Sequence, residues 1–228
     1  QGTLYGAGAM GGLLKYVTNE PDSTLFSGKL GLGLRSSKNG ALGHTQNAVL
    51  NVPLSQNVAA VRVAAFNDHD GGYLKAVGRA AGEHINDGNT RGARVSALIE
   101  PTTKLKVRLS AAAQNIERNG RASTEYDMAT GHPVYGDLTR HLDTSEAYTV
   151  RTRLSSADVE YDFGWARVNA IASAQRFDSG TGLDATALLA GAIPGLDVFG
   201  LDNTISLRKR TRELRLTSQP GRIEWLLG

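Results

Sequence analysis

Residues 104–111, which read KLKVRLSA, alternate strictly between apolar and polar side chains. Leu105, Val107, Leu109 and Ala111 occupy the odd positions, and lysine, arginine and serine fill the positions between them. Successive side chains of a β-strand point to opposite faces, whereas a helix would repeat its apolar residues every three or four positions. The stretch therefore predicts a strand with one apolar and one polar face.

The same alternation recurs along the chain and predicts nine strands. Their expected ranges are 27–36, 45–54, 58–68, 91–100, 104–114, 147–160, 165–177, 205–218 and 222–228. The eighth is irregular, because Leu214 and Leu216 are out of phase with Ile205 and Leu207. Such a phase change predicts a bulge or a protruding strand end.

The connections between these strands alternate in length. Three-residue turns follow the second, fourth, sixth and eighth strands, whereas the connections near 37–44, 69–90, 115–146 and 178–204 are long and polar. Short turns at one end and long loops at the other are typical of an outer-membrane β-barrel, with small aliphatic side chains toward lipid and polar ones toward the lumen. A soluble β-sandwich is the alternative. Aromatic residues near predicted strand ends suit an interfacial girdle: Tyr148, Trp165, Phe177 and Trp225.

Composition removes several other classes of protein. Glycine accounts for 27 of 228 residues, which disfavours a helical bundle because glycine is a poor helix former. The absence of cysteine excludes disulfides, thiolate metal sites and cysteine nucleophiles. A net charge of +3 without a clustered basic stripe gives no indication of nucleic-acid binding. We expect neither an enzyme nor a bound cofactor.

The glycine-rich opening matches a dinucleotide fingerprint only superficially. Gly6, Gly8 and Gly11 fit the spacing GxGxxG, which requires a strand before it and a helix after it. Val17 and Thr18, followed by Pro21, predict a strand and a stop instead. Nucleotide binding is therefore disfavoured.

The same segment resembles the end of the plug domain of TonB-dependent outer-membrane receptors. The matching positions are Gln1, Gly2, Thr3, Leu4, Tyr5, Gly6, Gly11 and Gly12, followed by Val17-Thr18 and Pro21. Residues 13–16 depart from the family pattern but keep strand character. Ser27-Gly28-Lys29, residues 51–55 and Gly71-Gly72-Tyr73 are similar to the family's early barrel strands and second outer loop.

The resemblance implies an all-β fold. It would be an antiparallel transmembrane β-barrel fragment with about nine of an expected 22 strands, preceded by the tail of a plug domain. Residues 1–25 would be the plug tail and residues 26–228 the N-terminal portion of the barrel, with both ends internal to a longer chain. The expected location is the outer membrane of a Gram-negative bacterium.

The resemblance also implies a function, namely active transport of a scarce solute such as a ferric siderophore. The expected partners are TonB and its inner-membrane energising complex, acting through a plug region upstream, together with outer-membrane lipid, lipopolysaccharide and a small-molecule nutrient. The alternative is a passive outer-membrane porin or another barrel without TonB coupling.

Candidate binding residues follow from the predicted lumen face. Five arginines are assigned to it: Arg94, Arg108, Arg151, Arg153 and Arg167. They would either attract an anionic solute or pair with carboxylates of the plug.

Other charged and histidine residues have open alternatives. The run Arg208-Lys209-Arg210 with Arg212 would bind lipopolysaccharide phosphates or form a solvated strand end. The histidines are expected in or beside outer loops, where they would capture metal or be solvated: His44, His69, His84, His132 and His141. The carboxylate pairs Glu20 and Asp22, and Glu125 and Asp127, are interpreted as loop charges.

Overall fold

The computed structural model describes residues 17–189 and 192–228, and in this part of the chain the fold is all-β. The strands of its sheet are β1 (Ser27–Arg35), β2 (Gly43–Ser55), β3 (Ala59–Asp70), β5 (Gly88–Thr102), β6 (Leu105–Arg118), β8 (Tyr148–Asp162), β9 (Ala166–Asp184), β10 (Gly200–Ser218) and β11 (Leu226–Leu227). The short strands β4 (Lys75–Val77) and β7 (Thr139–His141) and the single-turn helix α1 (Thr186–Leu189) lie in the connections. Within the described ranges, no helix is long and apolar enough to cross a bilayer.

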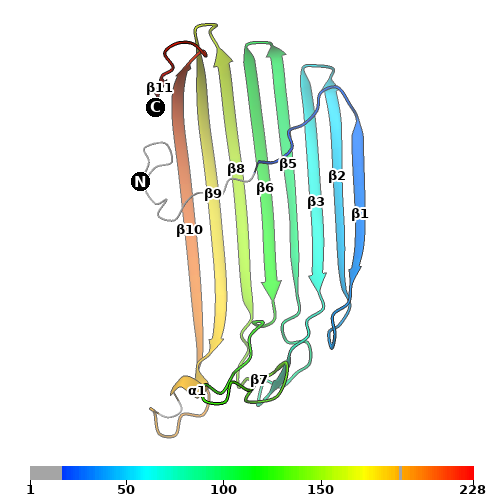
Figure 1. The fold of residues 1–228 in the computed structure, drawn as a ribbon, viewed down its shortest axis with the longest axis vertical. Helices are drawn as coiled ribbons and strands as arrows, with labels where there is room; N and C mark the ends of the chain where they lie inside the picture. The colour runs from blue at the N-terminus through cyan, green and yellow to red at the C-terminus, as the bar shows by residue number, and fades with distance from the viewer. Residues whose placement is uncertain (1–16, 190–191) are drawn as a thin grey trace.

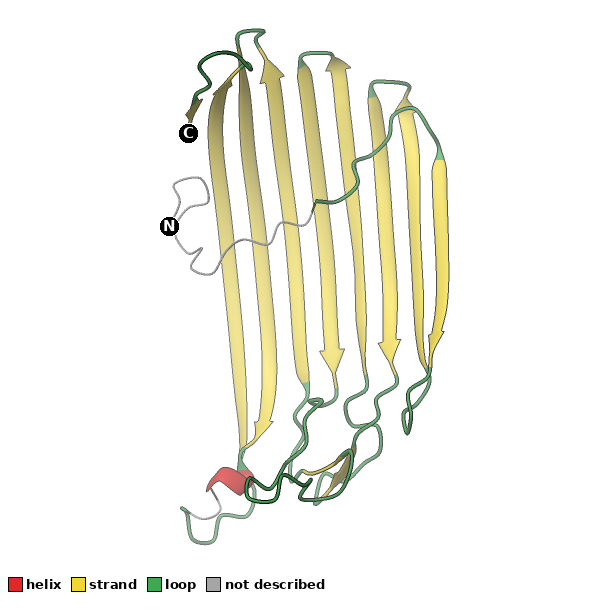
Figure 2. Cartoon of the chain, viewed as in Figure 1, coloured by secondary structure: helices red, strands yellow, loops and turns green. Residues whose placement is uncertain are grey.

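The nine strands form one antiparallel sheet in which each strand pairs with its neighbours in chain order (Figure 1). Short turns at residues 56–58, 103–104 and 163–165 lie at one end, and the long connections 36–42, 71–87, 119–147 and 185–199 lie at the other (Figure 2). Asn57 and Gly164 turn the chain with positive φ angles of 58° and 89°, a conformation that asparagine and glycine tolerate best. The predicted alternation is confirmed for the first three short turns, whereas the connection after β10 spans residues 219–225 and is longer than the predicted turn.

The observed strands coincide with the nine predicted ones but differ in length. β5, β9 and β10 continue three to seven residues further toward the long connections than expected, and β11 has only two residues. The extensions were missed because their side chains are polar or mixed, while their backbone groups still pair with neighbouring strands. Val17 and Thr18, predicted as a strand, have no regular structure.

The sheet has two chemically different faces. We call the side that carries Leu109 of β6 the apolar face and the side that carries Arg108 the polar face. Cross-strand pairing places Val63, Val95 and Ala111 in one row of the apolar face. The leucines of β1 on this face, Leu30, Leu32 and Leu34, are 72%, 75% and 78% exposed. A broad apolar surface is therefore open on one side of the sheet. The apolar face carries these exposed side chains: Leu30, Leu32, Leu34, Leu50, Val63, Val95, Ile99, Leu109, Val159 and Leu214.

Except on β1, the apolar character of this face is concentrated in the half of the sheet near the short turns. On β6 it extends over nine residues, from Leu105 to Ala113, before Asn115 and Glu117 follow on the same face. The loop-side half of the sheet is polar on this face except on β1, where Leu32 and Leu34 lie opposite Gln46 and His44. We call the turn-side half the apolar band.

β10 is not bulged. Its pairing with β9 is continuous from Gly200–Asp184 to Ser218–Ala166. Leu214 and Leu216 therefore lie on the apolar face, and Ile205 and Leu207 lie on the polar face. The predicted bulge is wrong. The strand is regular, and its apolar side chains lie on the apolar face near the short turns but on the polar face nearer the long connections.

Phe177, expected near a strand end, lies well inside β9, opposite Leu207.

Aromatic side chains gather at the turn between β8 and β9. The ring centroids of Tyr161 and Phe163 are 4.7 Å apart, and those of Phe163 and Trp165 are 6.3 Å apart. All three side chains are at least one-third exposed. The short-turn edge of the apolar band thus ends in a solvent-exposed aromatic cluster.

Candidate functional site

Residues 17–25 cross the polar face before the chain enters β1 (Figure 1). Asn51 of β2 is completely buried and fixes this segment. Its side-chain oxygen accepts the N–H of Asp22 at 2.8 Å, and its amide nitrogen donates to the carbonyls of Asp22 and Leu25 at 2.8 and 2.7 Å. The carbonyl of Ser23 accepts the N–H of Asn57 at 3.2 Å. The segment is therefore held through its backbone, independently of most of its side chains.

Glu20 supplies the charged attachment of the same segment. Its carboxylate accepts from Nζ of Lys106 at 2.8 Å and from Nε of Arg108 at 2.6 Å. The hydrogen bond from Lys106, aided by Arg108 and opposed by partial burial, lowers the pKa of Glu20 below its ordinary value. Glu20 is therefore an anchoring carboxylate rather than a free loop charge.

Arg108 is the centre of a larger network on the polar face. It also lies 3.5 Å from a carboxylate oxygen of Asp158 and 3.9 Å from one of Glu160. Arg167 extends the network, since it lies 3.4 Å from Glu160. Alternating cations and carboxylates compensate one another along β6, β8 and β9 near the short turns.

A hollow of about 250 Å³ separates residues 17–21 from the sheet beneath them. Arg94, Ser96 and Ser110 line its sheet side, together with Arg108 and Asp158. Within residues 17–189 and 192–228, Arg94 forms no ion pair. The polar face thus combines a compensated network with one arginine that faces an open space.

The register divides the five arginines that were predicted to share a face. Arg94, Arg108 and Arg167 lie on the polar face, as their cross-strand partners show. Arg151 and Arg153 lie opposite Asn115 and Ala113, on the apolar face, so their assignment to the same face as the other three is wrong. The alternation of residues 148–155 was read from the loop-side half of β8, where the polarity of the two faces is exchanged.

Two long connections, at 71–87 and 119–147, form a cluster at the loop end that no sequence signal predicted. β4 pairs in parallel with β7, which joins the connection at 71–87 to that at 119–147. Arg140 and Glu146 form a buried ion pair of 2.7 Å, and Glu146 also accepts the N–H of Asp184 at 3.1 Å. Leu74 and Leu142 are buried in the same region. These contacts join parts of the chain that lie far apart in the sequence.

A further ion pair reaches the fourth long connection. Arg79 donates to both carboxylate oxygens of Asp197, 118 positions away in the chain. This pairing lowers the pKa of the Asp197 carboxyl through the hydrogen bond from Arg79.

The histidines are distributed over the loop end. His44 and His69 are cross-strand neighbours with ring centroids 5.1 Å apart, and Asn89 lies 3.1 Å from Nδ1 of His69. His141 lies 3.7 Å from Asp143 and stacks on Tyr135. Across residues 17–189 and 192–228, no group of three or more metal-ligating side chains is assembled.

The family motif lies outside the described residues at Gln1–Gly6 and at Gly11 and Gly12. Comparisons with protein-family models, with curated proteins and with solved structures found no match.

Proposed function

We propose that this chain contributes the first strands of an outer-membrane transport receptor that is energised through TonB. In this proposal the apolar face contacts lipid, the polar face lines the lumen, and residues 17–25 are the end of a plug that fills it. The observation that supports it best is the opposite chemistry of the two faces combined with a segment bound across the polar one.

The apolar band has the dimensions and the exposure that a lipid-facing surface requires. Its nine-residue length on β6 agrees with the ~9–11 residues of a transmembrane strand. Exposed apolar patches larger than a few hundred Å² are uncommon on soluble monomers and indicate contact with a membrane or a partner. Leaving a leucine in water rather than buried costs about 1.5–3 kcal/mol, and β1 alone carries three highly exposed ones.

The edges of the sheet support an arc of a closed barrel. β1 pairs only with β2, and residues 200–215 of β10 pair only with β9 in the described part of the chain. Long unpaired edges invite aggregation, and barrel closure removes them.

The segment across the polar face favours a plugged receptor over an open porin. Its backbone clamp at Asn51 and its ion pairs to Lys106 and Arg108 hold it on the surface that would otherwise line a channel. The hollow beneath it, with Arg94 at its wall, would suit an anionic solute such as a ferric chelate.

Transport assays test this proposal directly. A strain that lacks the gene is compared with the parent strain for uptake of ferric siderophores, cobalamin and oligosaccharides, each with and without functional TonB. We expect at least one nutrient whose uptake requires both proteins. Uptake that needs this protein but not TonB, together with an open channel in planar bilayers, would establish the passive porin instead.

A further inference from the structure

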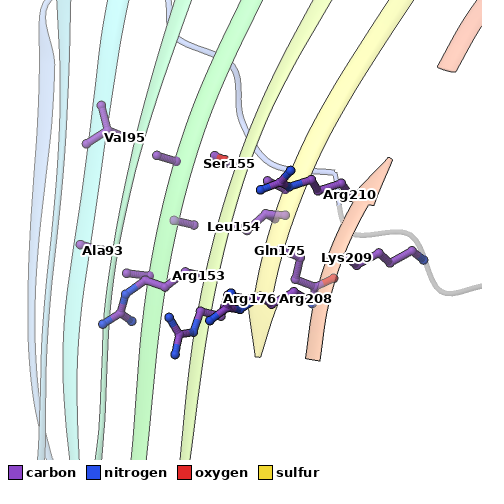
Figure 3. A pocket seen from close by; sticks show the side chains of 14 residues that line it. Ala93, Val95, Arg153, Leu154, Ser155, Gln175, Arg176, Arg208, Lys209 and Arg210 are labelled. Carbon is purple, nitrogen blue, oxygen red and sulfur yellow. The ribbon is translucent and has the colours of Figure 1, made fainter. Parts of the chain in front are cut away.

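Four arginines gather on the apolar face, at the loop-side edge of the apolar band, in the rows of Ala113 and Ala111. Arg153 lies directly opposite Arg176, and Arg176 lies directly opposite Arg208. Arg210 follows two positions further along β10 on the same face. We call Arg153, Arg176, Arg208 and Arg210 the arginine cluster; Figure 3 shows their side chains around one hollow.

The cluster is electrostatically under-compensated. Like charges directly opposite each other on neighbouring strands destabilise a sheet. In the described part of the chain, its one ion pair with a carboxylate is that of Arg176 with Asp178, at 2.7 Å. Arg153 donates to the neutral side chain of Asn115 at 3.0 Å. A bound anion would relieve this repulsion, and the planar guanidinium matches phosphate oxygens through paired hydrogen bonds.

The hollow beside the cluster has an apolar floor. Its volume is about 570 Å³. Small side chains of β5, β6, β8 and β9 form this floor: Ala93, Ala111, Ala113, Ser155 and Ala174. It continues into Val95 and the rest of the apolar band. An occupant that fits must therefore be anionic at one end and apolar at the other.

We propose that this surface binds a phosphorylated glycolipid of the outer leaflet, with its phosphates on the arginine cluster and an acyl chain in the hollow. The inference rests on the proposed function, which puts this face against lipid and the long loops outside the cell. The cluster lies on the loop side of the apolar band, at the level of the outer-leaflet headgroups. A soluble phosphate compound would satisfy the arginines but would leave the alanine floor uncovered.

Native mass spectrometry of the full-length protein in detergent tests the inference. The probe is bisphosphorylated lipid A, and the test variant is Arg153→Gln/Arg176→Gln/Arg208→Gln. We expect the unmodified protein to retain one lipid and the variant to lose affinity about tenfold or more, since one charge-assisted contact is already worth about that factor. The control Lys29→Gln/Lys104→Gln/Arg222→Gln removes the same charge at positions that do not line the hollow, and it should retain the lipid.

Three further probes separate the sources of phosphate. Dephosphorylated lipid A should bind about tenfold more weakly, phosphatidylglycerol should not replace lipid A, and inorganic phosphate should not displace it. Equal retention by the test variant and the unmodified protein would overturn the inference. Equal binding of dephosphorylated lipid A or phosphatidylglycerol, or displacement by inorganic phosphate, would also overturn it.

A second variant keeps the test decisive if the triple substitution prevents folding. Ala111→Phe fills the hollow and leaves every arginine in place, so it should lower lipid retention; unchanged retention contradicts the inference. Lipid binding is measured on purified protein. A receptor that transports with TonB but binds no glycolipid therefore overturns this inference alone, and glycolipid binding without TonB-dependent uptake overturns the proposed function alone.

Discussion

Replacing Asn51 with alanine should release residues 22–25 from the polar face. The side chain is fully buried and makes three hydrogen bonds to the segment, one to the N–H of Asp22 and two to the carbonyls of Asp22 and Leu25. At about 1 kcal/mol net for each hydrogen bond, the substitution removes about 3 kcal/mol of attachment. That loss corresponds to a roughly 100-fold higher population of the detached segment.

Hydrogen exchange at the Asp22 amide measures this detachment directly, because that N–H is protected by Asn51 itself. Exchange of the full-length protein in detergent should accelerate roughly 100-fold in Asn51→Ala. Asn47→Ala is the matched control, since Asn47 lies on the same strand and the same face but is exposed. An unchanged exchange rate in Asn51→Ala, or an equal acceleration in the control, would refute the reasoning.

Two other predictions concern charged contacts. Lys106 holds the pKa of Glu20 below its ordinary value of 4.5. The stability that Glu20 gives the segment is therefore complete above pH 4.5 and is lost as the pH falls through the lower pKa of the folded state. A spin label on the segment should become mobile in this acidic range, and Glu20→Gln should remove the pH dependence. In the loop cluster, Glu146→Ala removes the closer of the two carboxylates that pair with the buried Arg140 and leaves only Glu125, at 3.6 Å. It also removes the acceptor of the Asp184 N–H, so it should cost about 3 kcal/mol, measured as protease sensitivity of the loops. Glu83→Ala removes an exposed pair and should change nothing measurable.

The strands were predictable because an apolar and a polar face of one sheet impose a period of two on the sequence. KLKVRLSA identified β6 with its correct faces, and the turns at Asn57 and Gly164 followed from the breaks in alternation. The prediction weakened where the sheet continues past the apolar band. There the two faces exchange polarity, so Arg151 and Arg153 were assigned to the wrong face although β8 itself was found.

The loop cluster and the clamp at Asn51 could not be predicted, for a different physical reason. Arg79 and Asp197 are 118 positions apart, and the partners of Asn51 are backbone groups 26 and 29 positions away. No local pattern encodes such contacts, because any residue can offer a backbone N–H or carbonyl. A buried asparagine in an otherwise exposed sheet is recognisable only after the chain has folded over it.

The central claim is that one face of the sheet contacts lipid and the other faces a wet, plugged lumen. These 228 residues contain no cysteine, so a single cysteine introduced among them has no competing thiol in this part of the protein. A spin label is placed in turn at Leu109 and Val159 of the apolar face and at Ser110 and Ser156 of the polar face, with the full-length protein in bilayers.

Collisional relaxation by oxygen and by a water-soluble nickel chelate then reports what each label contacts. We predict that oxygen, which concentrates in lipid, relaxes the labels at 109 and 159 more strongly than the chelate does, and that the order reverses at 110 and 156. Preferential access of the water-soluble chelate to all four positions would contradict the account, because the apolar face would then be exposed to water and the sheet would not lie in a membrane.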